Sequence, residues 1–157
     1  MLKLLLFAAC EKVIVDLQGQ SSMVGLLEQV QVTVLKEMDP SMVTPFKWSI
    51  VTLWHREEDV PTPVKYQERM DLFRPDGVKA FQADSEFQVS NAYRNFRQNA
   101  DLPFMPIGLP GEYLLKLSLK TGEQDWREIA IYPFLVIHNA SADEGKNQEQ
   151  ETGDAER

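Results

Sequence analysis

Apolar and polar residues alternate along much of this chain with a period of two. Val30, Val32 and Val34 are separated by single polar residues, and this spacing places the valines on one face of a β-strand. Seven β-prone runs span residues 4–16, 23–35, 46–55, 64–74, 86–104, 113–119 and 126–138. Because Gly, Pro, Asp or Ser turn signals separate many of these runs, the pattern predicts an all-β protein.

Residues 86–104 allow two interpretations. As a strand, this run places Phe87 and Tyr93 on the same face. As a helix that begins after Ser90, it makes Tyr93 and Phe96 neighbours three residues apart. A strand is favoured, because no apolar stripe extends beyond one helical turn and prolines follow soon after.

The clearest hairpin lies toward the C-terminal end. Residues 113–119 alternate strictly, a turn follows, and residues 126–138 return with Ile129 and Ile131 on one face. Together with the earlier runs this gives about seven or eight antiparallel strands. Each sheet must bury one apolar face, and a second sheet supplies the cover. The predicted fold is therefore an antiparallel β-sandwich, immunoglobulin-like in general architecture.

The end of the chain differs from the rest in composition. The chain has 157 residues and a net charge of −8, and residues 139–157 hold six acidic and two basic residues with no large apolar one. Such a segment cannot bury enough surface to offset the entropy of ordering it. The sequence predicts one β-sandwich domain over residues 1–138 and a disordered acidic tail over residues 139–157.

Composition also limits partners and location. The longest apolar run, residues 4–10, is far shorter than the ~20 residues that span a bilayer. Residues 1–138 carry a net charge of −4, so they have little with which to neutralise a nucleic-acid backbone. Cys10 is the single cysteine, which rules out an intramolecular disulfide and suits a reducing compartment. We therefore expect a cytoplasmic protein without a membrane span or a nucleic-acid partner.

The first ten residues resemble a truncated lipoprotein signal. Lys3 precedes an apolar stretch, and two alanines precede Cys10. However, only nine residues come before the cysteine, whereas signal peptides usually have ~15–30 residues. We interpret the segment as the first strand and Cys10 as a buried small hydrophobe. Whether Cys10 is lipidated stays open.

Two resemblances extend this interpretation. The motif Pro-Gly-Glu-Tyr-Leu-Leu at residues 110–115 resembles the entry to the penultimate strand of immunoglobulin-like sandwiches, which implies a hydrogen bond from Tyr113 back to nearby backbone. The motif Cys-Glu-Lys-Val-Ile-Val-Asp at residues 10–16, with residues 25–28, 102–104 and 110–113, is similar to a family of small bacterial proteins of unknown function. That resemblance implies a free-standing cytoplasmic domain and carries over no catalytic residue.

Candidate metal ligands are few and scattered. His55 lies near Glu57, Glu58 and Asp59, but zinc prefers three or four convergent ligands and the other histidine is distant in sequence. The acidic residues expected on separate loops lack the dense spacing of a calcium loop; they are Asp39, Asp59, Asp84, Asp101 and Asp125. Solvated turns explain both sets, so no metal site is assigned.

Residues 93–97 interleave aromatic residues with arginines, as single-strand nucleic-acid platforms do. On a strand, however, Arg94 and Phe96 face away from Tyr93 and Arg97. Two arginines in an acidic domain make a weak patch, and we interpret this run as an amphipathic strand with a wet edge.

These observations lead to two functional hypotheses. The first is a non-catalytic β-sandwich that binds another protein or has a structural role, because the sequence has no catalytic motif and assigns no catalytic, cofactor-binding or metal-binding residue. The alternative is an enzyme or small-ligand binder whose site is assembled from distant residues. A deep pocket lined by aromatic residues would favour the alternative; the candidates are Trp48, Trp54, Trp126 and Tyr132.

Overall fold

The computed structural model of the chain describes residues 2–34, 36–60 and 62–141. Within these ranges every regular element is a strand, as the sequence predicts. No described helix is long and apolar enough to cross a membrane. The strands are β1 (Leu2–Val15), β2 (Ser21–Leu26), β3 (Gln29–Val34), β4 (Val43–Thr44), β5 (Trp48–Arg56), β6 (Val64–Phe73), β7 (Lys79–Val89), β8 (Asn95–Leu102), β9 (Met105–Pro106), β10 (Gly111–Thr121) and β11 (Arg127–Ala140).

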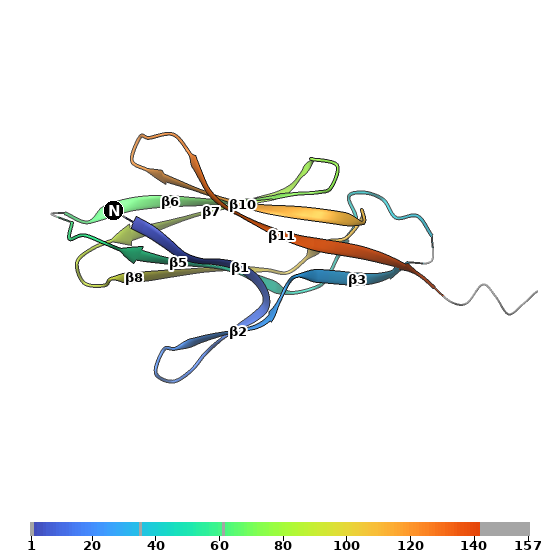
Figure 1. Cartoon of the computed structure of the whole chain (residues 1–157), viewed down its shortest axis with the longest axis horizontal. Coiled ribbons are helices and arrows are strands. Elements are labelled where there is room, and N and C mark those ends of the chain that lie inside the picture. The colour runs from blue at the N-terminus through green and yellow to red at the C-terminus, as the bar shows by residue number, and fades with distance from the viewer. Residues whose placement is uncertain (1, 35, 61, 142–157) are drawn as a thin grey trace, which may run out of the picture.

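The strands form two main sheets that pack face to face (Figure 1). Sheet A has the order β2-β1-β5-β8, and sheet B has the order β3-β11-β10-β6-β7. The short strands β4 and β9 pair with each other beside them. All pairs of strands are antiparallel except β3 and β11, which run parallel. The β-sandwich is therefore confirmed, with a single parallel pair among the described strands.

One apolar core joins the two sheets. From sheet A, β5 contributes Trp48 and Trp54, both almost completely buried. Trp48 packs edge-on against Phe134 of sheet B, with ring centroids 6.1 Å apart, and Trp54 stacks on Phe87 at 6.3 Å. The β-prone run over residues 46–55 forms β5, which lies between β1 and β8 and is buried on both faces.

The run predicted over residues 23–35 is not one strand. The chain leaves sheet A and enters sheet B between Leu27 and Glu28: the Leu27 amide donates to Ala9 of β1, whereas the Glu28 carbonyl accepts from Leu135 of β11. Gly25 adopts a positive φ of 65° just before this step, a conformation that other residues rarely take. The apolar alternation breaks at this step, where Leu26 and Leu27 are followed by Glu28 and Gln29, but a break in period does not show that the chain moves to the other sheet.

Residues 86–104 also divide. β7 ends at Val89, a turn follows, and β8 begins at Asn95, so the two strands lie in different sheets. The preference for strand over helix is confirmed, but the expected single face of Phe87 and Tyr93 is wrong, because Tyr93 lies in the turn and is exposed. These two divisions raise the two main sheets to nine strands within the described part of the chain.

The hairpin of β10 and β11 forms as predicted, with Tyr113 opposite Phe134. One detail differs. The register shifts where Leu117 faces Ala130 and Ser118 faces Glu128, so Ile129 packs toward the core while Ile131 is exposed. A β-bulge inserts one residue and thereby reverses the facing of the residues that follow.

The last described strand continues past the predicted domain boundary at residue 138. Asn139 and Ala140 pair with Thr33 and Val34 of β3, and Ser141 donates to the Val34 carbonyl at 3.2 Å. The added backbone hydrogen bonds order two residues that composition had assigned to the tail. The remainder of the predicted tail, residues 142–157, lies outside the described residues.

Candidate functional site

The residues considered as metal ligands do not converge. Nδ1 of His55 lies 2.8 Å from Oδ1 of Asn95, and Asp59 instead forms an ion pair with the buried Arg56. Among the described residues, no group of three or more His, Cys, Asp or Glu side chains is arranged to hold a metal ion. The loop after β5 is therefore arranged around Arg56.

The five aspartates considered for calcium are not all on loops. Asp84 lies in β7 and Asp101 in β8. Asp84 receives two hydrogen bonds of 2.8 Å from Arg69, and Asp101 accepts one of 2.6 Å from Ser49. Their carboxylates stabilise neighbouring strands, which explains their position without a bound cation.

Cys10 and the tryptophans are mainly structural. Burial raises the pKa of the Cys10 thiol, with the charge of Asp101 acting in the same direction, so the nucleophilic thiolate is disfavoured. Trp48 and Trp54 belong to the core, and Trp126 lies under the Arg69 guanidinium, 4.1 Å from its ring centroid. The three tryptophans and Tyr132 therefore do not line one common pocket.

The structure brings a different set of residues together. An apolar pocket of about 340 Å³ lies between the first residues of β7 and the residues that follow β8. These are edge strands of opposite sheets, so the pocket opens where the sandwich is not closed. Its walls include Pro40, Val43, Phe81, Leu102, Phe104 and Pro106.

The lip of this pocket is unusually apolar for an exposed surface. Phe104 is 54 % exposed and Val43 is 53 % exposed, and both line the pocket. Two more apolar residues near these segments are exposed. Met42 precedes Val43 in the chain, and Val78 lies in the turn before β7. Single exposed apolar residues are normal, whereas a group of them around a concavity is typical of a binding surface.

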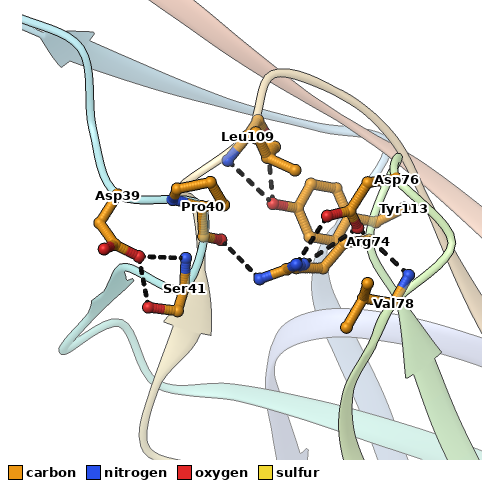
Figure 2. Close-up of polar contacts among 8 residues, drawn as sticks. All are labelled: Asp39, Pro40, Ser41, Arg74, Asp76, Val78, Leu109 and Tyr113. Atoms are coloured by element: carbon orange, nitrogen blue, oxygen red, sulfur yellow. Dashed lines mark hydrogen bonds and ion pairs between the residues drawn. The ribbon is translucent and has the colours of Figure 1, made fainter.

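Arg74 builds one wall of the pocket (Figure 2). Its guanidinium donates to Asp76 at 3.1 and 2.6 Å and to the Pro40 carbonyl at 3.0 Å. Asp76 also accepts from the Val78 amide at 3.1 Å. The hydrogen bonds from Arg74 lower the pKa of Asp76, and the hydrogen bond from the Ser41 hydroxyl lowers the pKa of Asp39, which precedes Pro40 in the chain. Arg74 thus fixes the turn before β7 against the loop before β4.

Tyr113 secures the segment behind this wall (Figure 2). Its side chain is buried, and its hydroxyl donates to the Leu109 carbonyl at 3.1 Å while accepting from the Leu109 amide at 3.4 Å. The backbone hydrogen bond implied by the immunoglobulin-like resemblance is therefore confirmed. The contact fixes the corner through which the chain leaves β9 and enters β10.

We expect Tyr113→Phe to lower the free energy of unfolding by about 1–2 kcal/mol, because two partly buried backbone groups of Leu109 lose their partner. Urea unfolding followed by tryptophan fluorescence measures the change. Tyr93→Phe is the matched control, since Tyr93 is exposed, and it should change stability by less than about 0.5 kcal/mol. Equal effects of the two substitutions would contradict the role given to the Tyr113 hydroxyl.

The polar groups of the pocket are already engaged with one another. The Ser41 hydroxyl donates to Asp39, Arg74 is paired with Asp76, and Lys79 is paired with Asp71 at 2.8 Å. A nucleophile needs an adjacent base, and a general base needs an accessible lone pair. Apart from Ser41, Arg74 and Lys79, the lining residues are apolar, so the pocket offers mainly apolar contact.

Sequence reasoning missed this pocket because its walls come from four separate segments. A local signal was present: Pro103, Phe104 and Pro106 place an aromatic residue among prolines, which restrict the backbone and remove hydrogen-bond donors. An aromatic residue in such a segment is typical of an exposed contact, yet nothing in the spacing indicates Pro40 or Phe81 as its neighbours.

Comparisons with known proteins add little to this picture. No protein-family model matches the chain, and no curated protein matches it. Among solved structures, the chain is similar to one described as the N-terminal domain of PorA, with 8 % sequence identity and a TM-score of 0.27 over 85 % of this chain and 97 % of that one. A likeness at this level carries no argument about fold or function. The described part of the chain is β-rich.

Proposed function

We propose that this chain is a non-catalytic recognition module that binds another protein by taking one of its apolar side chains into the pocket beside Phe104. The observation that carries the proposal is the apolar pocket of about 340 Å³ with exposed Phe104 and Val43 at its lip. Protein interfaces concentrate their affinity in a few anchors that fill such pockets. The buried Cys10 and the engaged polar groups support the non-catalytic part.

The rigid surroundings of the pocket favour recognition. Arg74 ties the loop at Pro40 to the turn at Asp76, and the indole N–H of Trp48 donates to the Phe104 carbonyl at 2.8 Å. The lip is therefore held by hydrogen bonds from buried or half-buried groups. A pre-organised surface loses less entropy when a partner binds.

Affinity purification from an extract of the native host tests the proposal, with the full chain as bait. We expect a co-purifying protein whose retention falls at least tenfold with Phe104→Ala, the effect of removing an anchor worth ~1.4 kcal/mol or more. The backbone carbonyl that Trp48 binds is unchanged by this substitution. Leu135→Ala is the control, because Leu135 is 40 % exposed and lies outside the pocket.

Equal retention by the wild-type chain and both variants would overturn the assignment of the pocket.

A second candidate function, small-ligand binding, follows from the pocket volume of about 340 Å³, which falls in the range of ligand sites. Native mass spectrometry of the purified chain distinguishes the two. A bound small molecule that is lost with Phe104→Ala supports the second candidate, and an unliganded chain supports protein recognition.

We include in this proposal that the module is a bacterial cytoplasmic protein. The single buried cysteine and the resemblance at residues 10–16 to a family of small bacterial proteins support it. Fractionation of the native host with an antibody to the chain tests the location.

A further inference from the structure

The two outer faces of the sandwich differ in chemistry. On sheet B, ion pairs join charged residues of neighbouring strands, as expected of a sheet face in water; they are Lys65–Glu86, Arg69–Asp84, Lys79–Asp71 and Lys116–Glu128. On sheet A, the outer face of the two central strands is apolar. Its residues are Leu6, Ala8 and Cys10 of β1 and Val51 and Leu53 of β5. We call these five residues the floor of sheet A.

The strand register shows that the floor faces away from the core. Leu6 lies opposite Leu53, and Ala8 lies opposite Val51. Directly opposite residues of a strand pair share a face. Along β5 the floor residues alternate with residues that pack between the sheets, such as Ile50. The floor is therefore an apolar sheet face on the outside of the sandwich.

The centre of the floor is recessed. Ala8 and Val51 are only 4 % and 3 % exposed, since both are small and stand between longer side chains. Leu26 lies opposite Cys10 on the same face and is 54 % exposed, so it forms part of a raised rim. A hollow of about 540 Å³ continues the recess at one end, where its lining includes Lys12. A narrow apolar element fits such a surface better than a flat one does.

Unpaired cations border the floor. Lys3 and Lys12 lie on β1 beyond its two ends, and Arg97 lies on β8 on the same face. None of the three forms an ion pair with another described residue. Among the described strand residues of this face, Asp101 is the one carboxylate, and it accepts a hydrogen bond from Ser49. The face is therefore cationic in a chain whose net charge is −8.

We propose that the floor of sheet A docks an amphipathic helix of a protein partner, with apolar side chains on the floor and carboxylates on both flanks of the helix. A helix packed on a sheet is a stable arrangement of layers. β1 and β8 are separated by β5, which places their cations two strand spacings apart, or about 10 Å. This separation matches the diameter of a helix, also about 10 Å. Carboxylates on the two flanks therefore reach Lys12 on one side and Arg97 on the other.

Charge and shape disfavour the other occupants. A second copy of this face would set the lysines and arginines of both copies against each other, and like charges across an interface cost affinity. A lipid bilayer contacts residues that protrude, whereas Ala8 and Val51 lie at the bottom of the recess. Residues 142–157 of this chain include carboxylates but no large apolar residue to cover the floor. An acidic amphipathic helix supplies both features.

This surface is separate from the pocket beside Phe104. The hollow at its end shares Leu102 and Pro103 with that pocket, but no floor residue lines the pocket. The two surfaces can thus be tested apart, and a failure of one leaves the other standing.

Fluorescence anisotropy of a dye-labelled peptide, titrated with the full chain, tests the proposal. The probe is a synthetic helix of about 18 residues, or five turns, with leucines on one side and glutamates on both flanks. The same peptide with lysines in place of the glutamates is its control. We expect the glutamate peptide to bind at least tenfold more tightly, because its carboxylates meet Lys12 and Arg97. Its affinity should fall as ionic strength rises.

Charge reversal on the chain identifies the face. The double variant Lys12→Glu and Arg97→Glu should bind the glutamate peptide at least tenfold more weakly than the wild-type chain does. The matched control is Lys65→Glu with Lys116→Glu, which gives the same net charge but lies on the outer face of sheet B. This control and Phe104→Ala should bind as the wild type does. Far-UV circular dichroism checks that each variant is folded.

Methyl NMR of the wild-type chain locates the contact without a variant. Signals of Val51 and Leu53 should shift when the glutamate peptide is added, while that of Leu135, on the outer face of sheet B, stays constant. Equal binding of the two peptides, wild-type binding by the double variant, or a shift of Leu135 in place of Val51 overturns the proposal. Binding to vesicles of anionic phospholipid without binding to the peptide assigns the face to a membrane and also overturns it.

Discussion

Gly108→Ala should be among the most destabilising single substitutions in this protein. A Cβ atom at residue 108 would lie 2.2 Å from the Asp39 carbonyl oxygen and 2.5 Å from that of Pro40. Both are backbone atoms, so no side-chain rotation relieves the clash. We expect the free energy of unfolding to fall by about 3 kcal/mol, the upper part of the usual range for inserting an extra carbon into packed structure. Urea unfolding followed by far-UV circular dichroism measures the loss.

A second glycine separates this steric effect from a backbone effect. Gly19 has a positive φ of 78° but nothing within 4 Å of its missing Cβ. Gly19→Ala should therefore cost only about 1 kcal/mol, for the left-handed conformation alone. If Gly108→Ala were no more destabilising than Gly19→Ala, the close approach between residues 39–40 and 108 would be contradicted.

The substitution also bears on the pocket. The loop that Gly108 touches carries Pro40, which lines the pocket and accepts a hydrogen bond from Arg74. A Cβ at residue 108 pushes that loop outward and separates the wall from the guanidinium. Thus the glycine, without contacting the pocket itself, determines its shape.

Glu68→Gln should make this protein more stable at neutral pH. Glu68 is completely buried between the sheets, where it accepts hydrogen bonds from the Trp54 indole at 2.9 Å and from the Ser85 hydroxyl at 3.3 Å. Burial raises the pKa of Glu68 above its ordinary value of 4.5, against the smaller opposite effect of these hydrogen bonds. Glutamine keeps an oxygen for Trp54 and removes the charge that burial disfavours.

The direction of the pH dependence follows from proton linkage. Between pH 4.5 and the higher native pKa, the folded chain binds a proton at Glu68 that the unfolded chain has released. Stability from this group is therefore complete below pH 4.5 and is lost as pH rises through the native pKa. Thermal unfolding of both proteins from pH 4 to pH 9 should show the wild-type curve falling below that of Glu68→Gln as pH rises.

Glu68→Leu is the control for the hydrogen bond. It also removes the charge, but it leaves the buried Trp54 N–H without its acceptor, which costs about 1–3 kcal/mol. It should be less stable than Glu68→Gln at every pH. Parallel pH curves for the wild-type chain and Glu68→Gln would contradict the raised pKa of Glu68.

Local pattern determined most of the fold. The alternation of residues 113–119 and the turn signals around them predict the β10–β11 hairpin, because side chains of a strand alternate whatever surrounds them. The same reasoning placed a strand over most of β5, and the resemblance at residues 110–115 implied the backbone hydrogen bond of Tyr113. These features depend on neighbours in sequence, and a single sequence contains that information.

Only the tertiary structure decided which sheet each strand joins and where the candidate site lies. The single run predicted over residues 23–35 is divided between the two sheets at Leu27 and Glu28, and the sequence did not reveal this because period and composition do not distinguish one apolar face from another. The inward-facing Glu68 and the meeting of Pro40, Phe81 and Phe104 likewise depend on contacts between distant segments. Such contacts are set by how the two sheets pack, which local propensity does not encode.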